Sequence, residues 1–319
     1  MENVTNTKFH NKLGMAFYHL DPRWISHYDF DSVADLGVVN AYRIAMESTG
    51  TLYYACKRAK KSGAQVWLAA PIFYSKRESL EEYMAGIDRY VEALKKNELW
   101  DTVVGFQWDE PLLKRAHTNA DFLAMTKAIS EAYGKRIFPV FSMQELLGFK
   151  GNPEDPDGIR SVHTEDTEYI TDVAFDVYGY DFRLPPSERF VKYFKELSDR
   201  FGVELKSTVD VYTYYTKRML EIVKNPDVRV WYFPCTYLAP LLGGARADED
   251  YCIAHIEGLK KMLLEQKNPG GLFCYGYKSW GNRDHLDWWL DEDNPERWER
   301  FIKVCQDTCK ELGEIDIKL

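Results

Sequence analysis

The chain has 319 residues, of which 45% are hydrophobic, 29% charged and 15% aromatic, and its formal net charge is −9 at pH 7. This composition excludes a disordered or fibrous chain, and the length fits one (β/α)₈ barrel or two medium-sized domains. The acidic balance argues against a nucleic-acid-binding surface, whose affinity depends on clustered cations that meet phosphates.

Short runs rich in β-branched and aromatic residues alternate with amphipathic helical stretches along the whole chain. We predict a first strand at 13–19 and a weaker second strand at 37–42. Six further strands are expected at 65–70, 102–108, 137–141, 172–179, 228–235 and 271–277.

Several of the intervening helices have recognisable starts. Ser79 and Glu82 form a capping box, and Thr118 can cap the helix that follows the fourth strand. A further helix is expected to open at 186, and the stretch 251–265 predicts another that ends at an Asn-Pro-Gly-Gly stop.

About eight alternations of strand and helix predict a parallel sheet, which at this length closes into a single-domain (β/α)₈ TIM barrel over residues 1–319. The segment 203–215 fits either a strand or a helix. Nine strands do not suit a simple barrel, so we interpret it mainly as a helix that runs to Val223. A doubly wound open sheet is the alternative, and it is disfavoured because no strand precedes a GxGxxG or P-loop turn.

Neither metal nor cofactor is expected. The six cysteines include no CxxC pair, and the seven histidines show no metal-ligand spacing. No apolar run approaches the ~18 residues of a membrane span, and residues 1–12 lack the basic and apolar regions of a secretory signal. We therefore expect a cytoplasmic protein that does not associate with membranes.

The active site of a (β/α)₈ barrel forms at the C-terminal ends of its strands, and the fourth strand ends in Asp109, Glu110 and Pro111. Pro111 cannot donate to a strand ladder, so the strand must stop here. In glycoside hydrolysis one carboxyl group protonates the leaving oxygen and another stabilises the developing oxocarbenium centre. We take Glu110 and Asp109 as catalytic candidates. The competing interpretation is that they only cap the next helix.

Other strand ends also carry polar and aromatic residues. Asp176, Tyr178 and Tyr180 alternate on one face of the predicted sixth strand, so we expect them to line the barrel mouth. Asp176 is a third catalytic candidate, or else a member of a buried ion pair. Two further candidates for substrate binding lie at the end of the first strand and after the eighth: His19, which could line the site, and Trp280, whose ring could stack on a sugar face.

The segment from Gly105 to Pro111, Gly-Phe-Gln-Trp-Asp-Glu-Pro, resembles part of the TIM-barrel glycoside hydrolases. It is most similar to the Asp-Glu pair after the fourth strand of family 20 β-hexosaminidases and family 123 N-acetylgalactosaminidases. The resemblance implies that Glu110 is the general acid. It also implies that Asp109 orients the substrate's own 2-acetamido group, which attacks the anomeric carbon with retention, and that Tyr180 or Tyr237 holds the carbonyl of that group.

Two alternatives stay open. Another type of barrel glycosidase keeps Glu110 as the acid and takes a carboxylate nucleophile from a later strand end: Asp176, Asp181 or Glu145. A sugar-binding barrel without catalysis would use its aromatic residues alone. The expected partner is a carbohydrate in every case.

Overall fold

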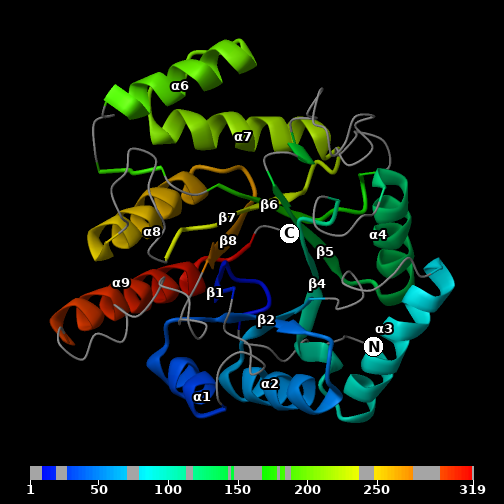
Figure 1. Cartoon of the computed structure of the whole chain (residues 1–319). Helices are drawn as coiled ribbons and strands as arrows, with labels where there is room; N and C mark the ends of the chain where they lie inside the picture. The colour runs from blue at the N-terminus through cyan, green and yellow to red at the C-terminus, as the bar shows by residue number, and fades with distance from the viewer. Residues whose placement is uncertain are drawn as a thin grey trace.

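The computed structural model describes residues 9–18, 27–69, 79–112, 118–142, 145–146, 167–177, 180–183, 188–236, 248–275 and 295–317. Within these ranges, eight parallel strands form one sheet that curls into a nearly closed barrel with helices on its outside (Figure 1). The predicted (β/α)₈ TIM barrel is therefore confirmed.

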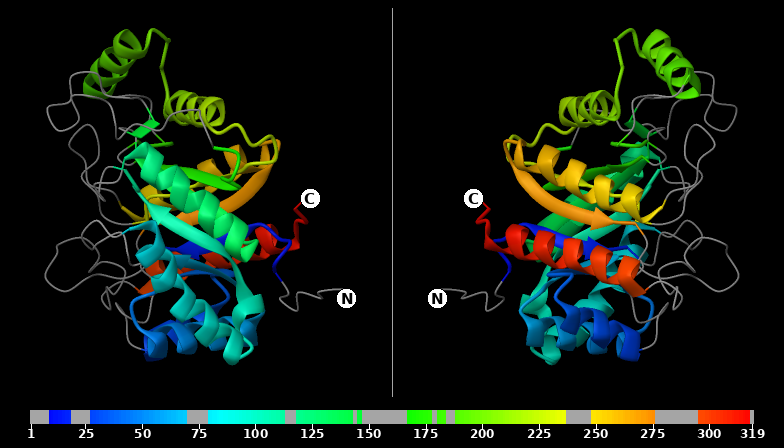
Figure 2. Two further views of the ribbon diagram at one scale, coloured as in Figure 1. Left: turned by 90° about the vertical axis from the view of Figure 1, so that its right-hand side faces the viewer. Right: turned by 90° about the vertical axis from the view of Figure 1, so that its left-hand side faces the viewer.

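The strands follow one another around the barrel in the order β1-β8-β7-β6-β5-β4-β3-β2. Their bounds are β1 Gly14–Phe17, β2 Ala41–Ala45, β3 Gln65–Ala69, β4 Val103–Asp109, β5 Arg136–Ser142, β6 Asp172–Asp176, β7 Arg229–Tyr232 and β8 Pro269–Cys274. The helices are α1 His27–Leu36, α2 Thr49–Ser62, α3 Leu80–Lys96, α4 Asn119–Tyr133, α6 Glu188–Phe201, α7 Thr208–Ile222, α8 Glu249–Leu264 and α9 Pro295–Glu314, with a short 3₁₀ helix η2 at Trp100–Thr102. Helix α6 lies outside α7, farther from the barrel (Figure 2).

The helix starts that depend on local sequence are confirmed. Ser79 and Glu82 form the capping box of α3, and the side chain of Thr118 caps α4. The helical interpretation of the segment 203–215 is confirmed from Thr208 onward, where α7 begins with a capping box on Ser207, while residues 203–207 precede the helix.

The predicted second strand, 37–42, is wrong at its start and at its end, because β2 spans Ala41–Ala45. Gly37 directly follows α1 and adopts the left-handed conformation (φ 71°). Val38 and Val39 then form a buried connection that leads into the strand. Their β-branched side chains resemble a strand in sequence, although they serve to pack this connection against the core.

The interior of the barrel holds its own apolar cluster. Trp67 of β3 meets Trp231 of β7 edge to face at 5.7 Å between ring centroids, and Phe138 of β5 lies 5.0 Å from Trp231. Because β3, β5 and β7 are not neighbours in the sheet, these rings can meet only inside the barrel. The cluster comprises Ala16, Tyr18, Ala41, Trp67, Val104, Phe138, Val140, Ala174, Trp231, Phe233 and Phe273.

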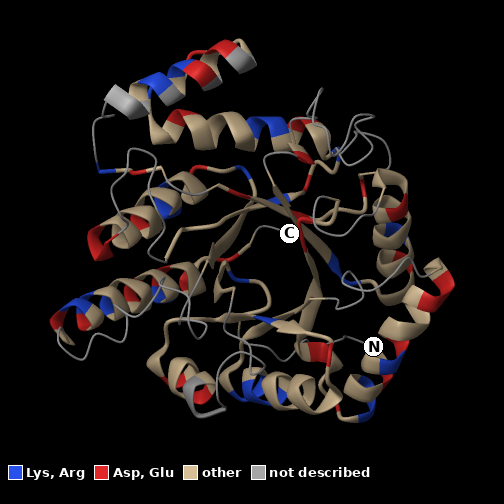
Figure 3. Cartoon of the chain, in the orientation of Figure 1, with Lys and Arg blue, Asp and Glu red and all other residues tan. Residues whose placement is uncertain are grey.

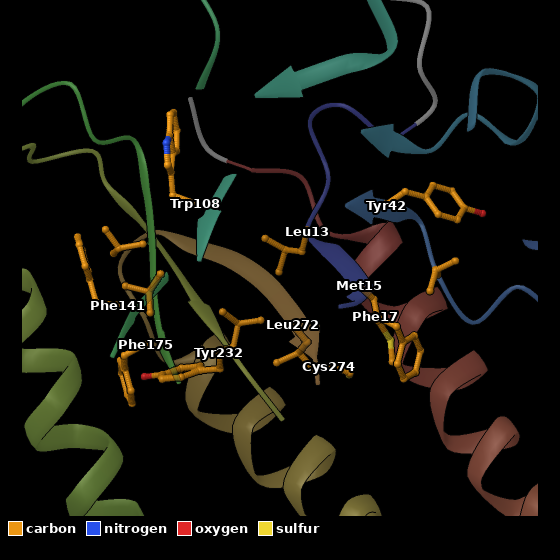
Figure 4. Close-up of a cluster of buried hydrophobic side chains, with 14 of the residues drawn as sticks. Leu13, Met15, Phe17, Tyr42, Trp108, Phe141, Phe175, Tyr232, Leu272 and Cys274 are labelled. Carbon is orange, nitrogen blue, oxygen red and sulfur yellow. The ribbon is translucent and has the colours of Figure 1, made fainter. Parts of the chain in front are cut away.

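Alternate strand residues form the larger apolar layer between the barrel and the helices (Figure 4). Met15 and Phe17 of β1, and Leu272 and Cys274 of β8, are examples, all at most 1% exposed. On the helices, Lys and Arg residues are interspersed with Asp and Glu residues (Figure 3). This is the expected distribution for helices that bury one face and expose the other.

The side chain of Asn40 joins the two strands at which the sheet order begins and ends. Asn40 Oδ1 accepts a hydrogen bond from the backbone N–H of Met15 at 2.6 Å, and Asn40 Nδ2 donates to the carbonyl of Leu13 at 3.0 Å. Its backbone N–H also donates to the Met15 carbonyl at 3.1 Å. A side-chain amide thus takes the place of ladder hydrogen bonds between β1 and the start of β2.

The N-terminal end of the barrel contains a buried charge network centred on Asp172, the first residue of β6. Its carboxylate accepts from Arg136 Nε at 2.6 Å, Arg229 Nε at 2.8 Å and the Trp231 indole N–H at 2.9 Å. Burial alone would raise the pKa of Asp172, but the two arginines and these hydrogen bonds outweigh it and lower that pKa. Asp172 is therefore ionised inside the barrel.

Replacing Gly271 with alanine is expected to lower the free energy of unfolding by about 3 kcal/mol. An added Cβ would overlap the backbone oxygen of Gly14 and the ring of Trp231, and neither can move within the packed barrel. Urea denaturation followed by circular dichroism measures the change. Gly50→Ala is the matched control: at this exposed position in α2 the nearest atom is 3.8 Å away, and we expect stabilisation of about 0.5–1 kcal/mol. A Gly271→Ala variant with an unchanged free energy of unfolding would contradict the packing argument.

Candidate active site

Three polar residues mark the C-terminal ends of β4, β6 and β8. Strand β4 is buried up to Trp108, and Asp109 is only partly buried; β6 likewise ends in the partly buried Asp176. Tyr275, which directly follows β8, is also partly buried. Since parallel strands end at the same edge of a barrel, these side chains belong to one mouth.

The side chains of β4 alternate between the two faces in a way that places Asp109 inside the barrel. Phe106 and Trp108 point outward, where their rings contact α4. Gln107 points inward, since its Oε1 accepts a hydrogen bond from Arg43 Nε of β2 at 2.6 Å. Asp109 lies two residues beyond Gln107 and hence on the same inner face.

The same alternation places Asp176 and Tyr275 inside. In β6, Phe175 packs outward on the rings of α7, so Asp176 faces inward. After β8, the ring of Tyr275 lies against Tyr18, with ring centroids 5.3 Å apart. Tyr18 in turn lies under the guanidinium of Arg43, whose Cζ is 4.2 Å from the ring centroid.

The electrostatic environment of Tyr275 includes both aspartates. Burial, followed by the charges of Asp109 and Asp176, raises the pKa of Tyr275 to about 12, while the Arg43 charge acts in the opposite direction. The structure therefore brings together the aspartates of β4 and β6, which are far apart in the sequence. It adds Arg43 and Tyr275 to the candidate site.

Glu110 has an unusual backbone conformation. Its φ of 44° is left-handed, although its N–H still donates to the carbonyl of Val140 at 2.8 Å, and its side chain is 7% exposed. A left-handed residue other than glycine costs about 1–3 kcal/mol and is enriched at functional sites. Because β4 ends at Asp109 and Glu110 is left-handed, the strand alternation does not extend to the Glu110 side chain.

Glu145 and Asp181, two of the three alternative nucleophiles, hold segments that follow the strands. Glu145 accepts hydrogen bonds from the backbone N–H of Leu112 at 2.6 Å and from that of Ser142 at 2.7 Å, and so ties the segments after β4 and β5 together. Asp181 is held by the guanidinium of Arg183 at 2.8 Å. Asp176 is the one of the three that lies at a strand end in the mouth.

The prediction that Tyr180 lines the mouth is wrong. Its side chain is 1% exposed, and its ring packs on Phe194 of α6, with ring centroids 6.1 Å apart. The alternation of β6 does not extend this far, because the strand ends at Asp176 and Val177 already packs into the outer apolar layer. The other residues predicted to bind substrate lie outside the described residues: His19, Tyr178, Tyr237 and Trp280.

A buried histidine connects the segments that follow β6 and β7. Nδ1 of His255 accepts from the backbone N–H of Cys235 at 3.3 Å, and Nε2 donates to the carbonyl of Tyr180. Burial lowers the pKa of His255 to about 4, so the ring is neutral near pH 7 and can play both roles. His255 thus has a structural role, in which its two hydrogen bonds join the segments that follow β6 and β7.

Arg43, Gln107, Tyr18 and Tyr275 were not among the residues singled out from sequence. Arg43 lies within the buried strand 41–45, and a charged residue in such a strand indicates an interior role. The predicted second strand ends at residue 42, so its alternation does not extend to Arg43.

Among the described residues, no group of three or more His, Cys, Asp or Glu side chains is arranged to hold a metal ion. None of the described helices has the length and apolar character needed to cross a membrane.

No protein-family model matches the sequence, and no curated protein matches it. Among solved structures, the chain is similar to a GH113 β-1,4-mannanase, with a TM-score of 0.50 and 10% identity over 94% of this chain and 96% of that chain. This likeness shows the fold: the chain is a (β/α)₈ TIM barrel. It is also similar to the exo-β-1,4-mannosidase Op5Man5 from Opitutaceae bacterium strain TAV5, at a TM-score of 0.50 and 13% identity over 94% of this chain and 59% of that chain. The mannanase belongs to family 113, and the finer resemblance to family 20 and family 123 enzymes stays a prediction.

Proposed function

We propose that this protein is a retaining glycoside hydrolase that acts on a carbohydrate with Glu110 as the general acid. The observation that carries the proposal is the position of Asp109 and Asp176, which end β4 and β6 at the same mouth of the barrel, with Glu110 directly after Asp109. Glycosidic bond cleavage needs one carboxyl group to protonate the leaving oxygen and a second group to stabilise the anomeric centre. This mouth offers both.

The proposed first step is the same in two versions. Glu110 gives its proton to the glycosidic oxygen as the bond to the anomeric carbon breaks. In the substrate-assisted version, Asp109 orients the 2-acetamido group of the sugar, and the carbonyl oxygen of that group attacks the anomeric carbon. Glu110 then acts as the base that activates water, and the anomeric configuration is retained.

A second version is favoured by the position of Asp176. Its carboxylate shares the neighbourhood of Tyr275 with Asp109 and has an inward orientation at the end of β6. It would attack the anomeric carbon directly and form a covalent glycosyl-enzyme, which water then hydrolyses. This version needs no 2-acetamido group on the substrate.

Chromophore release from paired aryl glycosides tests the proposal, each pair comparing a 2-acetamido sugar with its 2-hydroxy counterpart. Turnover confined to 2-acetamido sugars, lost in Asp109→Asn and kept in Asp176→Asn, would support substrate assistance. Turnover of 2-hydroxy sugars that is lost in Asp176→Asn would support the direct nucleophile.

Asp307→Asn is the matched control for these variants, because Asp307 lies exposed on α9 in an ion pair with Lys303. It should leave turnover unchanged. Wild-type protein that binds sugars in a titration but turns over no glycoside of any pair would contradict the proposal, and would favour a non-catalytic sugar-binding barrel.

A further inference from the structure

A buried polar pair joins β2 and β4 inside the barrel, below the mouth. Arg43 of β2 is 6% exposed and Gln107 of β4 is 1% exposed. Arg43 Nε donates a hydrogen bond to Gln107 Oε1 at 2.6 Å. Gln107 lies two residues before Asp109 on the inner face of the same strand. The pair therefore lies one step below the carboxylate that ends β4.

Two other strands have apolar residues at the corresponding step. Ala174 of β6 and Phe273 of β8 each lie two residues before the residue that faces the mouth, and both belong to the interior apolar cluster. Burying an arginine costs free energy unless the charge is paired and hydrogen-bonded, whereas apolar residues of similar volume fill the same space without this cost. Packing of the barrel interior therefore does not by itself explain Arg43 and Gln107.

The arginine fixes the orientation of the Gln107 amide. A carboxamide has a donor end and an acceptor end, and because a guanidinium only donates, Arg43 pairs with Oε1. The other end, Nε2, donates to the backbone carbonyl of Trp108 at 3.0 Å. The guanidinium is itself held over the ring of Tyr18, with its Cζ 4.2 Å from the ring centroid. The contacts thus lead from Tyr18 through Arg43 and Gln107 to the backbone of β4.

The carbonyl of Trp108 belongs to the peptide unit that leads into Asp109. Because a peptide unit is planar, a hydrogen bond to this carbonyl restricts the backbone at the last residue of β4. The next residue, Glu110, is left-handed (φ 44°), and its N–H donates to the carbonyl of Val140 at 2.8 Å. A residue in this conformation persists only when its surroundings hold it there. The bonds of Gln107 and Val140 hold the backbone on both sides of Asp109.

We infer that Gln107 is a positioning residue that holds the backbone from which Asp109 and Glu110 project. Arg43 supports it by fixing its amide. This inference rests on the proposed function, in which Asp109 and Glu110 must be placed accurately against a sugar. A displacement of about 1 Å in a reacting group can lower a rate by about 100-fold. Gln107 acts on the rate through the carbonyl of Trp108.

The first test is kinetic. Gln107→Met keeps the length of the side chain and removes both hydrogen bonds of the amide. For any glycoside that the wild type hydrolyses, kcat should fall by about 10- to 100-fold and KM should change by less than about threefold. Adding Arg43→Met to Gln107→Met should lower kcat little further, because Arg43 acts through Gln107. Gln107→Glu covers the case in which Gln107→Met does not fold: it keeps an acceptor for Arg43, and its carboxylate cannot donate to Trp108, so kcat should fall again.

The second test needs no turnover. Hydrogen exchange of the Glu110 backbone N–H, followed by NMR, reports how firmly the end of β4 is held. In Gln107→Met and Gln107→Glu we expect this exchange to be about 10- to 100-fold faster than in the wild type. Faster exchange in a protein that hydrolyses no glycoside would support the role of Gln107 in the backbone while overturning the proposed function.

Tyr232→Phe is the matched control. Tyr232 is a buried tyrosine of β7, and its hydroxyl lies on the helix side, 2.9 Å from Thr216 Oγ1 and 3.1 Å from Gln266 Nε2. Its loss removes buried hydrogen bonds away from β4, so kcat and the exchange of Glu110 should stay as in the wild type. Unchanged exchange in a folded Gln107 variant, or unchanged kcat in a protein that hydrolyses glycosides, would overturn the inference.

Discussion

Glu110→Gln is expected to lower kcat/KM by about 10²- to 10⁴-fold on glycosides with poor leaving groups. Glutamine has nearly the size of glutamate but cannot give up a carboxyl proton. The backbone hydrogen bond from residue 110 to Val140 is unaffected, so the fold should persist. A dinitrophenolate leaves without protonation, so the loss should shrink sharply on dinitrophenyl glycosides. Rates over a series of aryl leaving groups of rising pKa measure this dependence.

Glu98→Gln is the control for this experiment. Glu98 is the other non-glycine residue with a positive φ (56°) in the described part of the chain, but it follows α3 and precedes β4, at the opposite end of the barrel. The same chemical change there should leave all rates as in the wild type. A loss at Glu110 that is equally large for every leaving group would contradict a role as general acid.

Asp172→Asn is expected to lower the free energy of unfolding by about 3–5 kcal/mol. The substitution keeps the shape of the side chain but removes the charge that holds Arg229. The Arg229 side chain is 6% exposed and is also acted on by the like charge of Arg136. An arginine left in the barrel without its carboxylate bears a large desolvation cost. Denaturant titration at neutral pH measures the difference.

The pH dependence gives an independent check on Asp172. Because the pKa of Asp172 is lower in the folded protein than in the unfolded chain, its contribution is fully present above pH ~4 and is lost as the pH falls through the folded-state value. The difference in the free energy of unfolding between the wild type and Asp172→Asn should therefore become smaller as the pH falls. The control is Asp307→Asn, in an exposed pair on α9, which should change stability by less than about 0.5 kcal/mol. If Asp172→Asn and Asp307→Asn changed the free energy of unfolding by equal amounts, the importance of burial would be contradicted.

Sequence patterns located most elements because the relevant forces are local. The capping boxes at Ser79 and Ser207 satisfy backbone N–H groups within one turn of their helices. Only the box at Ser79 is predicted from the sequence. Pro111 correctly marked the end of β4, since a residue without an N–H cannot extend a ladder. The second strand failed because Val38 and Val39 have the composition of a strand but pack as a connection.

The limits of local reasoning are clearest around the candidate site. Alternation correctly placed Asp176 on the inner face of β6, because its period of two is a property of the strand itself. The same rule failed four residues later for Tyr180, where the strand had ended and packing against Phe194 decided the orientation. A local rule holds only as far as its element extends.

By itself, the sequence determined the alternation of strands and helices, the caps of several helices and the carboxylates that close β4. These depend on neighbouring residues, which are always close together in the chain. Only the tertiary structure decided which strand ends share the mouth, since that depends on strand order and the curvature of the barrel. The meeting of Asp109, Asp176 and Tyr275, and the contact of Arg43 with Tyr18, join segments separated by many residues. Such proximity arises from the closure of the sheet and leaves no local pattern to read.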